Sequence, residues 1–267
     1  MWRVKVEALK IIISGIIDGI TGFLPVSSSG HLLMLKNVFG FGVGNSVLFD
    51  LFLKLATIAV IVFAFRKDII KLIRFENGAY RKLALLILTA TVSTGIVGIA
   101  CRSFAAYASG TVVFPGIFLV ATGVMLFLTD GIKNGDMKIG DVGFFEAFVV
   151  GAVQGLAALP GLSRCGMVIA ACLLFGFNKK LTWRFAFLSA VPALIGSVVL
   201  DIIDIVRFGA SDAANTGWYI LAMIFAMITG YIGLIILNRI LRRGRFRILS
   251  IYCLALGGFM LASMIVM

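Results

Sequence analysis

The pattern of hydrophobic and polar positions along this chain predicts a membrane protein built from helices. Apolar stretches of about 20 residues, long enough for a helix to cross about 30 Å of hydrocarbon, recur along the sequence. A helix satisfies its own backbone hydrogen bonds, which lipid cannot do. We therefore expect an all-α membrane protein with six transmembrane helices, at about 46–65, 83–101, 111–129, 183–203, 217–237 and 248–267.

Two further apolar regions are interrupted near their middle. Region 8–43 contains the sequence Pro-Val-Ser-Ser-Ser-Gly at 25–30, and region 142–180 contains Pro-Gly-Leu-Ser-Arg-Cys-Gly at 160–166. Backbone that leaves a helix at membrane depth must be buried in protein or line a wet cavity. Each region is therefore predicted to be a re-entrant hairpin of two half-length helices around a polar tip.

The two hairpins are also related to each other. A shift of 136 residues pairs Gly15 with Gly151, Gly19 with Gly155, Ser27 with Ser163, Gly30 with Gly166, and Asp18 with Gln154. Each half then holds one hairpin and three spans. Because three is an odd number of membrane crossings, the second half has the opposite orientation in the membrane to the first. We expect a single membrane domain (1–267) made of an inverted-topology repeat, 1–133 and 134–267, whose site lies where the discontinuous helices meet.

Composition and charge support this arrangement. The chain is 61% hydrophobic and 13% charged, which a soluble domain cannot sustain. Its net charge of +12 comes from basic runs between apolar segments, chiefly within 66–82 and 239–247. We therefore expect these loops to face the cytoplasm, and we expect no nucleic-acid partner. Lys179, Lys180 and Arg184 fall on the same side, whereas the weakly charged segments 41–46, 102–110 and 204–216 fall outside.

Other simple assignments are excluded. Four cysteines without a CxxC pair and a single histidine do not indicate a zinc site or a disulfide framework. The N-terminal apolar run is interrupted by Asp18, Gly19 and Gly22, so no signal peptide is expected there.

Arg164 is the most informative candidate residue. A guanidinium at the centre of a membrane helix costs about 2.5–3.5 kcal/mol on insertion scales, so something must compensate for it. It stands at the start of a predicted half-helix, where free N–H groups and the helix dipole attract anions. A phosphate ligand is one explanation, and an ion pair with Asp18 is the other.

The tip of the first hairpin offers a nucleophile and a base. His31 can take a proton near neutral pH, and Ser27, Ser28 and Ser29 precede it. Serines at a helix start also act as caps, so both roles stay open. Asp18 can serve as an acid or base, as a ligand of a divalent cation, or as a structural partner of Arg164.

The remaining acidic residues of the apolar segments are expected to be structural. Asp50 and Lys54 are four residues apart and should neutralise each other. Glu146 and Asp201 are expected near the membrane surfaces, where they reach water.

Residues 19–31, Gly-Ile-Thr-Gly-Phe-Leu-Pro-Val-Ser-Ser-Ser-Gly-His, resemble the first signature of the undecaprenyl-diphosphate phosphatase family, also called bacitracin-resistance proteins. Residues 160–166 resemble its second signature. The resemblance implies removal of the terminal phosphate from undecaprenyl diphosphate at the outer side of the bacterial plasma membrane, with a divalent cation such as Mg²⁺ or Ca²⁺. The lipid carrier would be recycled for cell-wall synthesis, and this activity would confer bacitracin resistance. The chain could also form a homodimer.

The same resemblance implies roles for individual residues. Arg164 would clamp the diphosphate, Ser28 or Ser27 would be the nucleophile, His31 the base, and Asp18 a catalytic group and metal ligand. The implied substrate-binding residues are Ser27, Ser29, Ser163, Gly30, Gly166 and Gln154.

The chain also departs from the family pattern. The family has two glutamates four residues apart on the first half-helix, where this chain has Asp18 and Gly22. Cys165 replaces a usual serine, Val168 a frequent threonine, and Arg184 a common acidic residue. A polyprenyl-phosphate transporter, or an impaired paralogue, is therefore the alternative to a phosphatase. An ion channel is disfavoured because the tips carry no rings of like charge.

Overall fold

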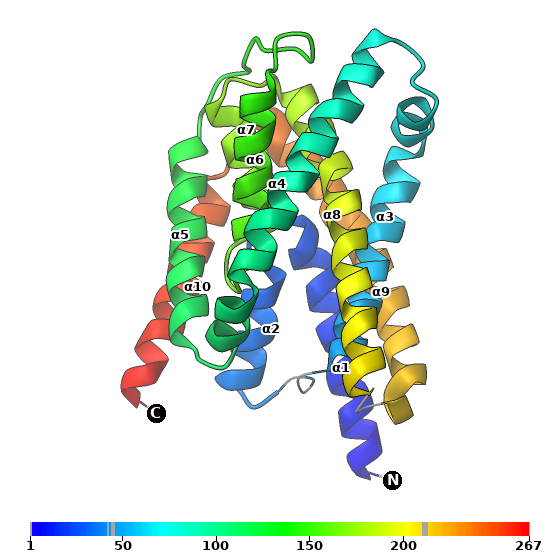
Figure 1. The fold of residues 1–267 in the computed structure, drawn as a ribbon. Coiled ribbons are helices and arrows are strands. Elements are labelled where there is room, and N and C mark those ends of the chain that lie inside the picture. The colour runs from blue at the N-terminus through cyan, green and yellow to red at the C-terminus, as the bar shows by residue number, and fades with distance from the viewer. Residues whose placement is uncertain (1, 42, 44–45, 210–212, 267) are drawn as a thin grey trace.

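The computed structural model describes residues 2–41, 43, 46–209 and 213–266, and within them it contains helices and no β-strand (Figure 1). The predicted all-helical architecture is confirmed. The helices are α1 (Trp2–Phe23), α2 (Ser28–Asn37), α3 (Val47–Ile73), α4 (Gly78–Ser109), α5 (Val113–Thr129), α6 (Phe144–Leu156), α7 (Arg164–Leu174), α8 (Lys179–Phe208), the 3₁₀ turn η1 (Ala213–Asn215), α9 (Thr216–Arg243) and α10 (Arg247–Val266).

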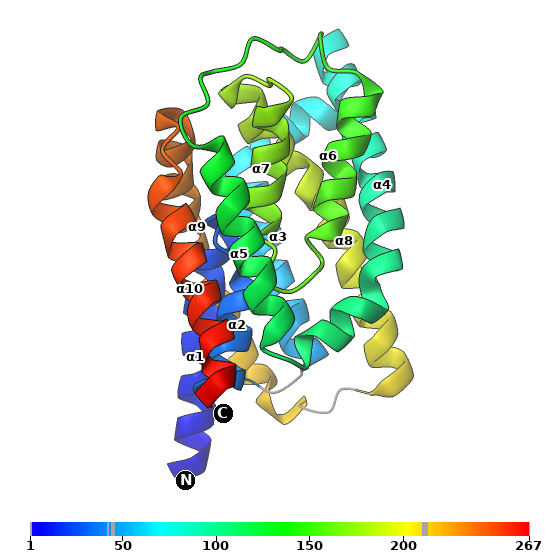
Figure 2. The same ribbon diagram turned by 90° about the vertical axis from the view of Figure 1, so that its left-hand side faces the viewer.

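Four of these helices, α3, α4, α8 and α9, are long and apolar enough to cross a membrane. The helices α5 and α10 coincide with the other two predicted spans and are shorter apolar helices over the residues described. The two pack against each other, and Figures 1 and 2 show both running along one side of the bundle. All six predicted spans are therefore helical.

The helices extend beyond the predicted spans into the basic segments. Arg66, Lys67 and Lys71 lie on α3, so the connection to α4 is only residues 74–77. A helix that leaves the hydrocarbon keeps its hydrogen bonds, and nothing in the charge pattern marks where it ends. Phe65 has non-helical angles (φ −104°, ψ 16°), and Figure 1 shows the last turns of α3 bent away from its axis.

Both interrupted regions form helical hairpins. Figures 1 and 2 show α2 turning back toward the end of the bundle where α1 begins, whereas α6 and α7 lie at the opposite end. The first arm of the first hairpin is longer than the predicted half-length helix, because α1 has 22 residues while α6 has 13. The two turns lie near the middle of the bundle (Figure 2).

Glycines let α1 approach α9 and α6 approach α4 closely (Figure 1). A Cβ atom added at Gly15 would lie 2.6 Å from the carbonyl oxygen of Ala222 on α9, and one added at Gly151 would lie closer still to that of Ala90 on α4. Small residues at helix interfaces permit such approach inside membranes. The glycines that the sequence alignment paired thus pack in corresponding ways.

We expect Gly15→Ala to destabilise the protein by about 1–3 kcal/mol, because the added methyl group collides with backbone that cannot rotate away. Gly258→Ala is the matched control, since a Cβ there has nothing within 4 Å and alanine favours the helix. Thermal unfolding in detergent measures both variants. Equal melting temperatures for the two would contradict the close α1–α9 contact.

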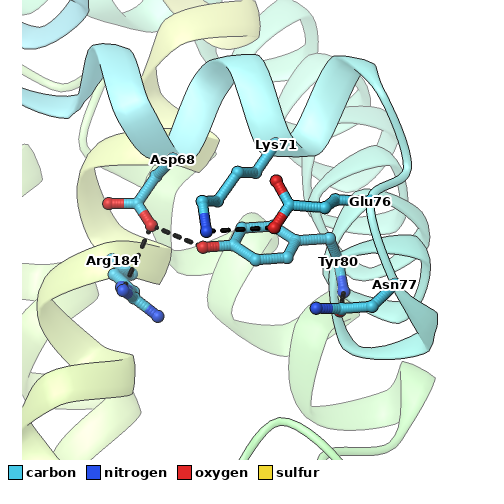
Figure 3. A network of polar contacts seen from close by, with 6 residues as sticks. All are labelled: Asp68, Lys71, Glu76, Asn77, Tyr80 and Arg184. Carbon is cyan, nitrogen blue, oxygen red and sulfur yellow. Dashed lines mark hydrogen bonds and ion pairs between the residues drawn. The ribbon is translucent and has the colours of Figure 1, made fainter.

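A polar network joins three helices at the end of the bundle that carries the basic residues (Figure 3). The Asp68 carboxylate accepts a hydrogen bond from Tyr80 Oη (2.9 Å) and lies 3.2 Å from Arg184 Nη2. Lys71 and Glu76 pair nearby at 3.0 Å. Arg184, which replaces a common acidic residue, is therefore neutralised by α3 and ties α8 to it.

Candidate active site

The tips of the two hairpins meet at a cavity of about 780 Å³. The Gly161 N–H group donates to Ser29 Oγ at 3.3 Å, and a Cβ added at Gly166 would lie 3.0 Å from Pro25 Cβ. The cavity is lined by Asp18, Gly22, Ser27, Ser28, Ser29, Lys36, Asp50, Lys54, Thr94, Arg102, Gln154, Ser163, Arg164 and Asp201, among others. Polar residues from both halves of the sequence therefore share one space.

The second tip presents Arg164 to this cavity. Ser163 caps α7, its Oγ accepting from the Gly166 N–H at 3.2 Å, so Arg164 is the first residue of the helix. Thr122 of α5 holds the turn between Gly161 and Ser163. Its Oγ1 accepts from Ser163 N–H and donates to the Gly161 carbonyl, both at 3.1 Å. The guanidinium thus starts from a fixed backbone at a positive helix end.

The first tip presents Ser28. Ser27 caps α2 by accepting from the Gly30 N–H at 3.3 Å, and its backbone has φ 64°, a left-handed conformation that costs energy in a residue other than glycine. Ser28 follows as the first helical residue; it lines the cavity together with Asp18, and its hydroxyl interacts with the Asp18 carboxylate. A hydroxyl and a carboxylate that can take its proton are therefore adjacent.

The structure does not support His31 as the base for this serine. Nδ1 of His31 lies 2.7 Å from the Ser27 carbonyl oxygen, which can only accept, so Nδ1 carries the proton. Nε2 lies 2.6 Å from Tyr252 Oη and accepts from it, and His31 is not among the residues lining the cavity. Both ring nitrogens therefore have hydrogen-bond partners outside the cavity, and the imidazole helps to hold the strained turn at Ser27 in place.

Three other predicted binding residues have structural partners. The N–H groups of Gly30 and Gly166 are taken by their caps, and neither glycine lines the cavity. Gln154 does line the cavity, but its Nε2 donates to Thr94 Oγ1 at 3.1 Å and to the Ser189 carbonyl at 3.4 Å. Ser29 instead joins the two tips, as described above.

The acidic residues are arranged differently from the sequence-based expectation. Lys54 forms its ion pair with Asp201 of α8, at 2.6 Å, and no ion pair in the part of the chain that the structure describes joins it to Asp50. Asp201, predicted at the membrane surface, is only 13% exposed and lines the cavity. Among the ion pairs between described residues, none joins Asp18 to Arg164, although their charges interact. Spacing along one helix cannot reveal a partner on another.

The side chains at this site do not fit a resident divalent cation. Such ions prefer several oxygen ligands, usually carboxylates. Asp18 has Gly22, with no side chain, at the position one turn later, and the positive charges of Arg164 and Lys54 act on it. Over the described part of the chain no group of three or more His, Cys, Asp and Glu side chains could hold a metal ion.

Sequence reasoning missed two residues that shape the site. Thr122 and Tyr252 lie on α5 and α10, in apolar stretches that gave no polar motif. Thr122 is fully buried, and a buried hydroxyl needs partners, so its position inside a predicted span was the only signal.

Comparisons with known proteins agree over nearly the whole chain. A family model described as bacitracin resistance protein BacA matches residues 11–259. A protein named undecaprenyl-diphosphatase from Halothermothrix orenii is 34% identical over 253 residues, covering 94% of this chain and 96% of that protein. Proteins of the same name from Carboxydothermus hydrogenoformans (35% over 254 residues; 94% and 95% covered) and Methanobrevibacter smithii (32% over 269; 94% and 95%) are also similar.

Proposed function

The chain belongs to the bacitracin resistance protein BacA family, and on that premise we propose that it hydrolyses undecaprenyl diphosphate to undecaprenyl phosphate and inorganic phosphate. The observation that carries the proposal is Arg164 facing a cavity between two hairpin tips that also holds Ser28 and Asp18. The product would return to cell-wall synthesis as a lipid carrier, and its supply would confer bacitracin resistance.

Arg164 supports a phosphate ligand by its chemistry. A guanidinium donates two parallel hydrogen bonds to phosphate oxygens, and such charge-assisted bonds are strong away from bulk water. Arg164 is also the first residue of α7, and the start of a helix attracts anions. The terminal phosphate of a lipid diphosphate supplies the negative charge that this end of α7 lacks.

Ser28 and Asp18 support the hydrolytic step. The Ser28 oxygen attacks the terminal phosphorus while Asp18 accepts the hydroxyl proton, and the bond between that phosphorus and the bridging oxygen breaks. Polyprenyl phosphate leaves, and water then hydrolyses the phosphoserine to release inorganic phosphate. Arg164 stabilises the charge that develops on the transferred group.

We also propose six membrane crossings in an inverted repeat. The matching glycine contacts of α1 with α9 and of α6 with α4, and the matching caps Ser27 and Ser163, support two related halves. The cavity includes Lys36, Arg102 and Asp201, which belong to the later parts of α2, α4 and α8. Figure 1 shows these three helices ending at the end of the bundle opposite the connections from α3 to α4 and from α9 to α10. By the positive-inside rule, the end with the basic segments faces the cytoplasm and the cavity end faces the outer side. We propose that the chain is a multi-pass protein of the plasma membrane.

Phosphate release from purified protein tests the activity. With long-chain polyprenyl diphosphate in detergent, we expect one phosphate and one polyprenyl monophosphate per substrate over many turnovers, and none from heat-denatured protein. If release is zero and remains zero in Gly22→Glu, while labelled polyprenyl phosphate crosses protein-containing vesicles, the chain is a transporter and the proposal fails.

A further inference from the structure

Lys54 is a second cation inside the cavity that the proposed chemistry leaves without a role. It lies on α3, it lines the cavity together with Arg164, and its side chain is 29% exposed there. Its Nζ is 2.6 Å from Asp201 Oδ2 on α8. A lysine within an apolar helix is costly, so an ammonium group at this depth indicates a compensating function.

Lys54 shares the cavity with three carboxylates, those of Asp18, Asp50 and Asp201. It pairs directly with Asp201, and its charge also acts on Asp50 and on Asp18. Arg164 acts on Asp18 as well. Asp18, the acid beside Ser28, therefore lies within the electrostatic reach of two protein cations, one on α3 and one on α7.

A divalent cation near Asp18 would meet repulsion from these two groups. Like charges repel strongly in a cavity shielded from bulk water, and a doubly charged ion feels twice the repulsion that a single charge would feel from each cation. Gly22 supplies no carboxylate to offset the repulsion. In other diphosphate sites a metal ion supplies the positive charge. Here the Lys54 ammonium group already supplies positive charge in the cavity.

We propose that Lys54 is a second headgroup-binding residue, which with Arg164 neutralises the diphosphate and reduces the need for a divalent cation. This inference rests on the proposed diphosphate substrate. The Lys54 ammonium is mobile on four methylene groups, so it can exchange Asp201 for a phosphate oxygen at little cost in geometry. A purely structural tie between α3 and α8 is the alternative, and Asp68 with Arg184 already provides one at the other end of the pair.

Two binding measurements on Lys54→Gln test this, and neither requires turnover. Binding of a non-hydrolysable polyprenyl methylenediphosphonate in EDTA should weaken about tenfold, the value of one charge-assisted hydrogen bond. Binding of Mn²⁺ alone, followed by electron paramagnetic resonance, should strengthen about tenfold, because a repelling charge is removed. Lys71→Gln is the matched control: it removes a lysine of the same helix, also paired with a carboxylate, outside the cavity.

Lys54→Gln paired with Asp201→Asn keeps an amide pair between the helices and separates folding from binding. If this double variant is folded and binds the diphosphonate as tightly as the wild type does, Lys54 is structural and the inference is overturned. Failure of the proposed hydrolysis gives a different result, namely no phosphate release from wild type while both binding changes are still observed.

Discussion

Arg164→Ala is expected to lower kcat/KM for polyprenyl diphosphate by about 10²–10³-fold. The guanidinium stands at the start of α7 and lines the cavity beside the other hairpin tip. Losing a bidentate, charge-assisted contact in a site shielded from water costs about 3–4 kcal/mol, and each 1.36 kcal/mol is a factor of ten. Steady-state phosphate release measures the change.

Arg164→Lys is the informative control for this prediction. Lysine keeps the charge but not the planar fork, so we expect an intermediate loss of about tenfold. Both variants should keep the wild-type melting temperature within a few degrees, because no described ion pair depends on Arg164. Arg164→Ala with unchanged kcat/KM would show that another residue binds the headgroup.

Gly22→Glu is expected to raise turnover about tenfold and to make it depend on a divalent cation. A Cβ atom at Gly22 has only Ser28 within 4 Å, at 3.8 Å from Oγ, so a longer side chain has room. Residues 18 and 22 share one face of α1, and a second carboxylate there would join Asp18 as an oxygen ligand. The Mg²⁺ dependence of phosphate release checks this.

Gly22→Gln separates charge from size in that experiment. It has the same length as Gly22→Glu but supplies no negative charge, so it should show neither the gain nor the dependence on Mg²⁺. Equal behaviour of the two variants would mean that the open space beside Ser28, and not a missing carboxylate, limits the rate.

The layout of the fold was predictable because lipid imposes a single strong constraint. Long apolar stretches had to be helices, and the prolines at 25 and 160 had to mark turns at which helices stop. The pairing of Gly15 with Gly151 also anticipated a shared packing role. The exact ends of α3 and α4 were not predictable, since charged residues continue a helix once it has left the hydrocarbon.

The site was only partly predictable, because its partners come from distant segments. Arg164, Ser28 and Asp18 are brought together as expected, yet the separation of Lys54 from Asp201 by 147 positions hides their ion pair from any spacing rule. His31 shows the same limit, since its orientation depends on Tyr252 of α10. A motif fixes which residues are near a turn, whereas the packing of other helices fixes where each side chain points.

Photocrosslinking tests the central claim most directly, namely that a lipid diphosphate binds between the hairpin tips. A polyprenyl diphosphate with a photoreactive group beside the diphosphate is bound to the purified protein, irradiated, and the attachment sites are read by mass spectrometry. We predict attachment within residues 25–30 and 160–166, lost on competition with unlabelled lipid. Attachment confined to the basic segments at the opposite end, with none at the tips, would contradict it.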